Sequence, residues 1–381
     1  MAVLVVLICA GMPIPAAADR TPDGAPVAAQ GAGKRWHATI AASNGDAGWR
    51  EGGQLVFQTA FDAPLHLRDT LTLSAVAGGQ VDRGMGLARA AAAHYRLSLG
   101  DWRLAFGARR SQLRRALAIG QARLDWRWHG TDMQAEIGHE VMRGDQSLTM
   151  RAGLFRRQAA GSIDGVDLDV QRLRTAGWTV GLQHRHAGRQ LAATLDASWM
   201  ADLPGGHGSR HDPWAMPQAC RAAPVVRLRA ALGALASGMP ALQRPFRVDT
   251  ALLLQRTMTH GAAQPSSHFS IGDRQTVRGF GGRHVLAAEN GWAVSNELTI
   301  PAWQGAVQWV AGADVGHVWG PAAAALPGRT LAGAGVGVRG RWPRAGAAAL
   351  HLELSLGWPL RMPRAFAGHR GSLWLQLAST F

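Results

Sequence analysis

Apolar and polar residues alternate along most of the chain from Trp36 onward. The pattern is cleanest in Ala349–Gly357, where every second residue is a leucine and His351 and Glu353 lie between them. Side chains of a strand point alternately to opposite faces, so this segment has an apolar face and a polar face. No amphipathic helix is long enough to cover the apolar face. The pattern therefore predicts an all-β fold, a transmembrane antiparallel β-barrel whose leucines face lipid and whose polar residues face a watery lumen.

The spacing of the alternating segments predicts about sixteen strands. Bacterial barrels have an even number of strands, but seventeen starts can be assigned. The surplus one is most simply placed between Trp102 and Met133. The segment 269–280 lies in a long break between alternating strands, which predicts a long loop. The starts lie near Trp36, Gln54, Thr70, Arg89, Trp102, Gln121, Met133, Ser147, Arg174, Leu191, Val225, Arg247, Trp292, Ala306, Leu331, Ala347 and Ser372.

The C-terminal segment independently supports a barrel. Leu373, Leu375 and Leu377 share one parity with the terminal Phe381. A last strand that ends in an aromatic residue resembles the assembly signal of bacterial outer-membrane barrels, which would make the barrel-assembly machinery a partner. The alternative is a soluble edge strand that happens to end in phenylalanine.

The N-terminal segment differs from the rest in composition. Residues 1–18 predict a signal peptide with cleavage after Ala18, although its n-region has no positive charge and is atypical. Residues 19–35 are rich in Ala, Gly and Pro and predict a linker, so the barrel should occupy residues 36–381. No other run approaches the roughly 20 apolar residues of a membrane-spanning helix. Cys220 would be alone after removal of Cys9, which excludes an internal disulfide.

The chain is strongly basic. It has 40 Lys and Arg against 25 Asp and Glu, a formal charge of +15. A basic chain suggests an acidic partner such as nucleic acid, anionic lipid or a lined channel. The basic runs are short and scattered over the alternating segments, as in Arg109-Arg110 and Arg156-Arg157. This distribution favours arginines placed strand by strand, so no nucleic-acid partner is expected.

Five segments, in order, resemble the outer-membrane transporters of two-partner secretion, the haemolysin-activator or filamentous-haemagglutinin-transporter family. The first resembles the early D-N-P-L-x-L-x-D turn of the family, with Ala63 in place of the usual Asn. The second resembles its V-Q-R-x-R-T-A-G-W stretch. The resemblance covers residues 36–381 and implies a barrel that exports a large unfolded partner protein of haemolysin or adhesin type across the bacterial outer membrane. The segments are Phe61–Ser74, Val170–Trp178 with Gly181–His186, Phe269–Phe280, Ala288–Trp292 with Asn296–Leu298, and Trp358–Leu360.

The resemblance also implies a functional site. In the family, a V-R-G-F/Y motif lies at the tip of a long extracellular loop folded into the lumen, and its arginine pairs with an aspartate on the inner wall. Here the motif is Val277, Arg278, Gly279 and Phe280, and the aspartate is Asp314. A guanidinium offers a rigid fork to a carboxylate. The less specific alternative is an exposed loop arginine and an unrelated strand aspartate.

Strand parity places Asp314 without reference to the family. Val307, Trp309 and Val315 share one parity and would face lipid, so Asp314 would face the lumen. We expect an arginine-bearing lumen with the loop as a latch.

Family members carry periplasmic POTRA domains that capture the secreted partner. About 36 residues precede the first strand, too few for one such domain, so these domains are expected to be absent. A passive porin-like channel and a non-functional truncated transporter are therefore alternatives.

Other constellations carry less chemistry. His184 and His186 share one face of a strand, but no carboxylate or cysteine is placed with them; we favour a lumen or loop role. The segment Gly208–Asp212 lacks a G-x-S-x-G nucleophile elbow, and Gly333–Gly337 lacks the lysine of a phosphate loop. We therefore expect no catalytic residues, no metal and no cofactor.

Overall fold

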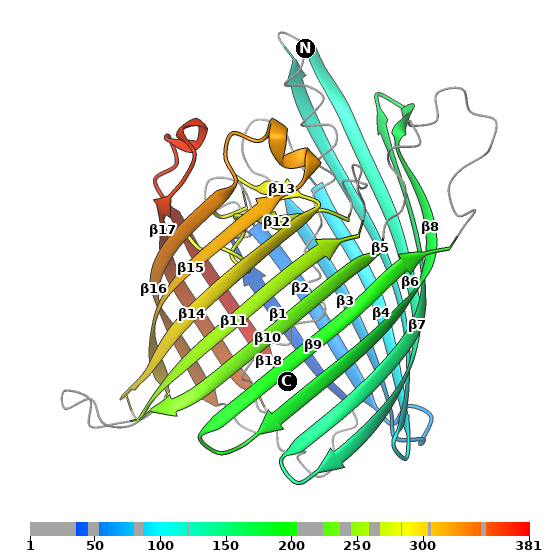
Figure 1. Cartoon of the computed structure of the whole chain (residues 1–381), viewed down its shortest axis with the longest axis vertical. Helices are drawn as coiled ribbons and strands as arrows, with labels where there is room; N and C mark the ends of the chain where they lie inside the picture. The colour runs from blue at the N-terminus through cyan, green and yellow to red at the C-terminus, as the bar shows by residue number, and fades with distance from the viewer. Residues whose placement is uncertain are drawn as a thin grey trace.

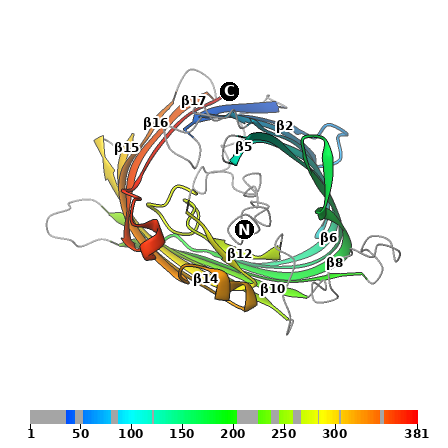
Figure 2. The same ribbon diagram turned by 90° about the horizontal axis from the view of Figure 1, so that it is seen from above.

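The computed structural model describes residues 36–44, 53–79, 87–119, 122–203, 224–236, 245–258, 267–282, 284–303, 306–343 and 348–381. Within these residues, sixteen antiparallel strands close into a barrel (Figures 1 and 2). The prediction of an all-β barrel is confirmed. The expected signal peptide, the linker, Cys220 and the segment 208–212 lie outside the described residues.

The strands follow one another around the barrel in chain order, and the last pairs with the first. The barrel strands are β1 (Trp36–Ser43), β2 (Gly53–Asp62), β3 (Asp69–Gly79), β4 (Leu87–Leu99), β5 (Trp102–Ile119), β6 (Ala122–Arg143), β7 (Gln146–Ile163), β8 (Val166–Ala187), β9 (Leu191–Asp202), β10 (Val225–Ala236), β11 (Phe246–Thr257), β14 (Asn290–Ala302), β15 (Val307–Trp319), β16 (Thr330–Pro343), β17 (Ala349–Arg361) and β18 (Ser372–Thr380).

The surplus strand start is Met133. Residues Ala122–Arg143 form the single strand β6, which absorbs the starts assigned at Gln121 and Met133. The start assigned at Arg174 is eight residues late, because β8 begins at Val166. A bulge opposite Gly161 shifts the register of β8 against β7 and interrupts the alternation on which the assignment depended.

The alternation predicted from the sequence sets the two faces of the wall. Leu354 and Leu356 are 42% and 51% exposed on the outer face, as a lipid-facing surface requires. Glu353 has the opposite parity and contacts lumen groups. In the described parts of the chain, no helix is both long and apolar enough to cross a membrane.

The closing seam joins the two ends of the barrel. Strands β1 and β18 pair from Thr39↔Thr380 to Ser43↔Gln376. Beyond the strand, the backbone N–H of Phe381 donates to Ala38 O at 2.9 Å. The Phe381 side chain is 42% exposed. Its role as an assembly signal stays a prediction.

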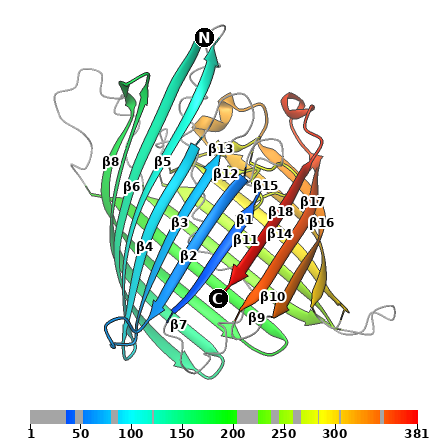
Figure 3. The ribbon, with the colours of Figure 1, turned by 180° about the vertical axis from the view of Figure 1, so that it is seen from behind.

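The two rims of the barrel differ. The C-terminus lies at one rim, and the segment containing β12 (Phe269–Ile271) and β13 (Leu286–Ala288) lies near the other (Figures 1 and 3). Strands β5 to β8 are 18 to 22 residues long, about twice the 9–11 residues that cross a membrane, and the β5–β6 hairpin projects beyond this second rim (Figure 3). Connections at the C-terminal rim are short, such as 144–145 between β6 and β7. Short turns are periplasmic and longer loops extracellular in such barrels, which makes the second rim extracellular.

Candidate functional site

The described residues between 269 and 288 form a compact loop inside the barrel, which we call the lumen loop (Figure 2). Its β12 and β13 pair antiparallel from Phe269↔Ala288 to Ile271↔Leu286. After β12, Asp273 organises the turn: its Oδ1 accepts from the backbone N–H groups of Gln275 and Thr276, both at 2.9 Å. An aspartate that bonds the backbone just after itself stabilises a turn. The turn carries the chain directly to Val277 and Arg278.

The structure brings Arg278 and Asp314 into contact. Arg278 Nε lies 2.9 Å from Asp314 Oδ2, and the backbone N–H of Arg278 donates to the same oxygen at 2.9 Å. The Asp314 side chain is 1% exposed and that of Arg278 is 20% exposed. Because the backbone N–H also bonds the carboxylate, the contact fixes the loop main chain as well as the arginine side chain.

Gly279 holds the turn against the wall through its backbone. Its φ is +92°, and a Cβ there would lie 2.5 Å from the carbonyl carbon of Trp358. Only glycine combines this left-handed conformation with so close an approach. The carbonyl of Gly279 bonds His369 Nε2. The ring of His369 also stacks on Phe280, with centroids 5.7 Å apart.

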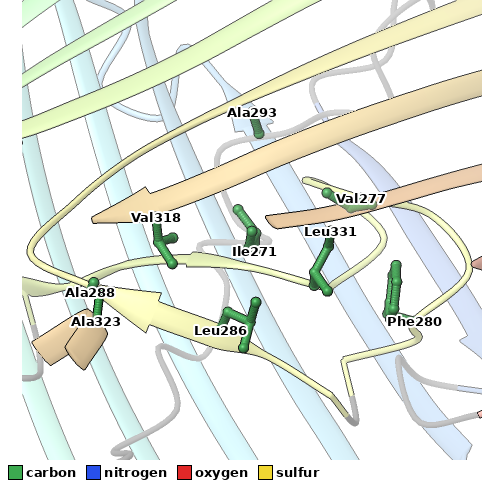
Figure 4. Close-up of a cluster of buried hydrophobic side chains, with 9 residues drawn as sticks. All are labelled: Ile271, Val277, Phe280, Leu286, Ala288, Ala293, Val318, Ala323 and Leu331. Atoms are coloured by element: carbon green, nitrogen blue, oxygen red, sulfur yellow. The ribbon is translucent and has the colours of Figure 1, made fainter. Parts of the chain in front are cut away.

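A small apolar core holds the loop to the wall (Figure 4). Its members come from the lumen loop, from strands β14 to β16, and from the 3-10 helix η3 (Pro321–Ala325). A second short helix, η4 (Arg364–Phe366), contributes Phe366 at its edge. Burial of such side chains stabilises by about 25 cal/mol for each Å² removed from water. The buried members are Ile271, Val277, Phe280, Leu286, Ala288, Ala293, Val318, Ala323 and Leu331.

Glycines line the wall where the loop is closest. A Cβ added at Gly333 would lie 1.9 Å from the carbonyl oxygen of Arg278, and one at Gly312 would lie 1.8 Å from its Nη1. At Gly316, a Cβ would be 2.8 Å from Ile271 Cγ2. The segment Gly333–Gly337 is part of β16. Because Gly333 has no side chain, the loop backbone can approach this strand closely.

The loop arginines enter a charge network that spans five adjacent strands. Asp314 on β15 contacts Arg278 of the lumen loop. Arg278 Nη2 in turn lies 3.5 Å from Glu297 Oε2 on β14. Arg339 on β16 bonds both oxygens of Glu297.

The network continues to the closing seam. Arg339 Nε lies 3.1 Å from Glu353 on β17, and the same carboxylate bonds Arg274 of the loop. The Arg274 guanidinium sits over the Trp374 ring of β18, 4.2 Å from its centroid. The network of Arg274, Arg278 and Arg339 with Glu297, Asp314 and Glu353 is neutral. Because these groups are partly buried, removing one of them would leave its partners with uncompensated charge.

Sequence reasoning missed most of this network. Glu297 lies within a motif segment and Arg274 within the segment 269–280, but neither has a local pattern that predicts a partner. Glu353 faces the lumen as expected, but its side chain is only 20% exposed and lies between Arg274 and Arg339, which the sequence did not predict. Strand parity could predict that Glu297 and Glu353 face the lumen, but it could not predict which residues they contact.

The histidine expectation was wrong. His184 and His186 share the parity of Leu182, which is 46% exposed on the outer face, so both belong to the outer face of β8. Among the described residues, no group of three His, Cys, Asp or Glu side chains could hold a metal ion.

The closed barrel, its apolar outer face and its lumen-docked loop define an outer-membrane β-barrel protein. The model of the haemolysin secretion/activation protein ShlB/FhaC/HecB family matches residues 27–340, and the chain belongs to this family. Its location is therefore the bacterial outer membrane.

Individual relatives are also outer-membrane transporters or share the fold of this chain. The outer membrane transporter CdiB-2 of Burkholderia pseudomallei (strain 1026b) is 36% identical over 146 residues, which are 37% of this chain and 25% of that protein. The solved structure of CdiB from Acinetobacter baumannii superposes with a TM-score of 0.76 at 18% identity, over 91% of this chain and 60% of that one. CdiB from Escherichia coli gives 0.76 at 21% identity, over 91% and 63%. At these identities the two structures establish a shared fold. The chain spans less than two thirds of each of these proteins.

Proposed function

We propose that the chain is the translocation pore of a two-partner secretion system, which exports a large, largely unfolded protein of haemolysin or adhesin type. Membership of the family supports this proposal, and the lumen-docked loop carries it. No ATP is available in the periplasm, so the cargo would cross by threading, extended in the lumen and folding outside.

We further propose that the lumen loop acts as a latch. Its contacts combine a desolvated ion pair, an apolar core and a close backbone approach, so it is held in one position on the inner face of β14 to β18. Removing Arg278 would leave the Asp314 carboxylate without its partner, at a cost of roughly 3–5 kcal/mol, less where lumen water screens the charge. The latch therefore provides a defined docked state from which the loop can shift when cargo enters.

An export assay would distinguish a translocation pore from a passive channel. A candidate exoprotein encoded by a neighbouring gene would serve as cargo, in a host without its own transporter, with the full chain expressed alone or with periplasmic receptor domains of a family member. We expect the cargo in the medium only when the chain is present. Purified protein in planar bilayers would provide the companion measurement. Conductance without export under either condition would overturn the proposal in favour of a porin-like channel.

A further inference from the structure

The outer faces of β7 and β8 change from apolar to basic at one level. Along β7 the apolar outward residues end with Leu154, which is 62% exposed. The next outward residue is Arg156, which is also exposed. Along β8 the outward residues Leu182, Val180 and Trp178 lead to the exposed Arg174. Both arginines therefore lie at the extracellular edge of the apolar band, where lipid headgroups begin.

The pairing register places the two arginines side by side. Arg156 pairs with Ala176, and Arg174 pairs with Gln158. Arg156 and Arg174 are thus diagonal neighbours on one face, about 7–8 Å apart at their backbones. Gln158 lies between them, and its amide oxygen can accept from the Arg156 guanidinium.

The same row extends to a third arginine. Gln158 pairs with Thr131 on β6, and Thr131 pairs with Arg110 on β5. Arg110 is also exposed and has the outward parity of Phe106, which is 51% exposed. Two strand spacings separate Arg110 from Gln158, about 10 Å.

These arginines lack acidic partners. Within the described ranges, no carboxylate lies within ion-pair distance of Arg110, Arg156 or Arg174 on the outer face. Nearer the hairpin tip the situation differs, because Arg114 and Arg127 both pair with Asp125, at 2.9 and 2.7 Å. Like charges on neighbouring strands repel each other, so a bound anion would relieve the repulsion.

We propose that Arg156, Gln158 and Arg174, with Arg110 beside them, bind the phosphate groups of lipopolysaccharide in the outer leaflet. Guanidinium groups bind phosphate oxygens through paired N–H donors. Leu154 and Trp178, directly below on the same strands, contact the acyl chains. A bisphosphorylated glycolipid can place one phosphate between Arg156 and Arg174 and the other near Arg110. The proposal rests on the outer-membrane location and is independent of export.

The test is native mass spectrometry of the full chain in detergent with purified bisphosphorylated lipid A as the probe. We expect wild-type protein to retain lipid A and to bind it at least about tenfold more tightly than its dephosphorylated form, because charge-assisted hydrogen bonds are lost with the phosphates. The double variant Arg156→Gln/Arg174→Gln should lose this preference.

The matched control is Arg109→Gln/Arg157→Gln, which removes the same charge from the lumen face of β5 and β7. It should bind lipid A like wild type. Heat-modifiable migration in gels would verify folding, and the wild-type comparison of the two lipids stands even if the double variant does not fold. Equal binding of both lipids by wild type, or undiminished binding by the folded Arg156→Gln/Arg174→Gln protein, would overturn the proposal.

Discussion

At the scale of single residues, the turn between β2 and β3 is where the chain departs from the family pattern, with Ala63 in place of the usual Asn. Asp69 is buried, and its carboxylate accepts from the backbone N–H groups of Leu65 and Leu67 and from Tyr95 Oη, each at 3.0 Å. This turn requires a φ of +52° at Ala63. Asparagine occupies such left-handed conformations more readily than alanine, which gives a physical reason for the Asn that the family usually has here.

Ala63→Asn should therefore stabilise the barrel by up to about 1 kcal/mol, because it relieves left-handed strain in a turn that is otherwise unchanged. Urea unfolding of the detergent-solubilised protein, followed by tryptophan fluorescence, would measure the change. Ala63→Val is the matched opposite, since a β-branched residue fits this conformation worse than alanine. A stability order with Val above Asn would refute the interpretation.

At the scale of elements, strand parity was the most informative signal in the sequence. It assigned lipid and lumen faces correctly for Leu354, Glu353 and Asp314 because the side-chain period in a strand is two everywhere in the sheet. It failed where the period breaks, at the β8 bulge. It also could not reveal β12 and β13, whose three residues each are too few to show a period.

Gly333→Ala should release the lumen loop, because the new Cβ would lie 1.9 Å from the carbonyl oxygen of Arg278 and backbone cannot yield as a flexible side chain can. Limited trypsin digestion of the folded protein would then cut after Arg274 and Arg278 several-fold faster, since protease cleavage follows the open population. Gly78→Ala is the matched control, with its nearest Cβ contact at 3.5 Å. Equal cleavage rates in Gly333→Ala and wild type would show that the close approach does not hold the loop.

At the scale of the whole molecule, the two sides of the barrel are built differently. The wall from β14 to β18 carries the lumen loop and its neutral charge network, whereas β5 to β8 project beyond the extracellular rim (Figures 1 and 3). The family resemblance implied the pairing of Arg278 with Asp314, and strand parity independently placed the aspartate on the lumen face. The sequence could not connect Glu297, Arg339 and Glu353, because their contacts depend on how the four neighbouring strands β14 to β17 lie side by side. Such contacts join residues far apart in the chain, and no local sequence pattern records them.

The export yield of Arg278→Ala tests the central claim most directly. The claim is that the docked loop, fixed by Arg278 to Asp314, is part of the export mechanism. The cargo described above would be quantified in the medium for wild type, for Arg278→Ala and for Arg229→Ala, whose arginine faces the lumen from β10, outside the network of the described residues that holds the loop. With all three barrels equally folded by heat-modifiable migration, export should fall about tenfold or more in Arg278→Ala alone, because the loop would lose the partly buried ion pair that fixes its docked position. Wild-type export by Arg278→Ala would contradict the account.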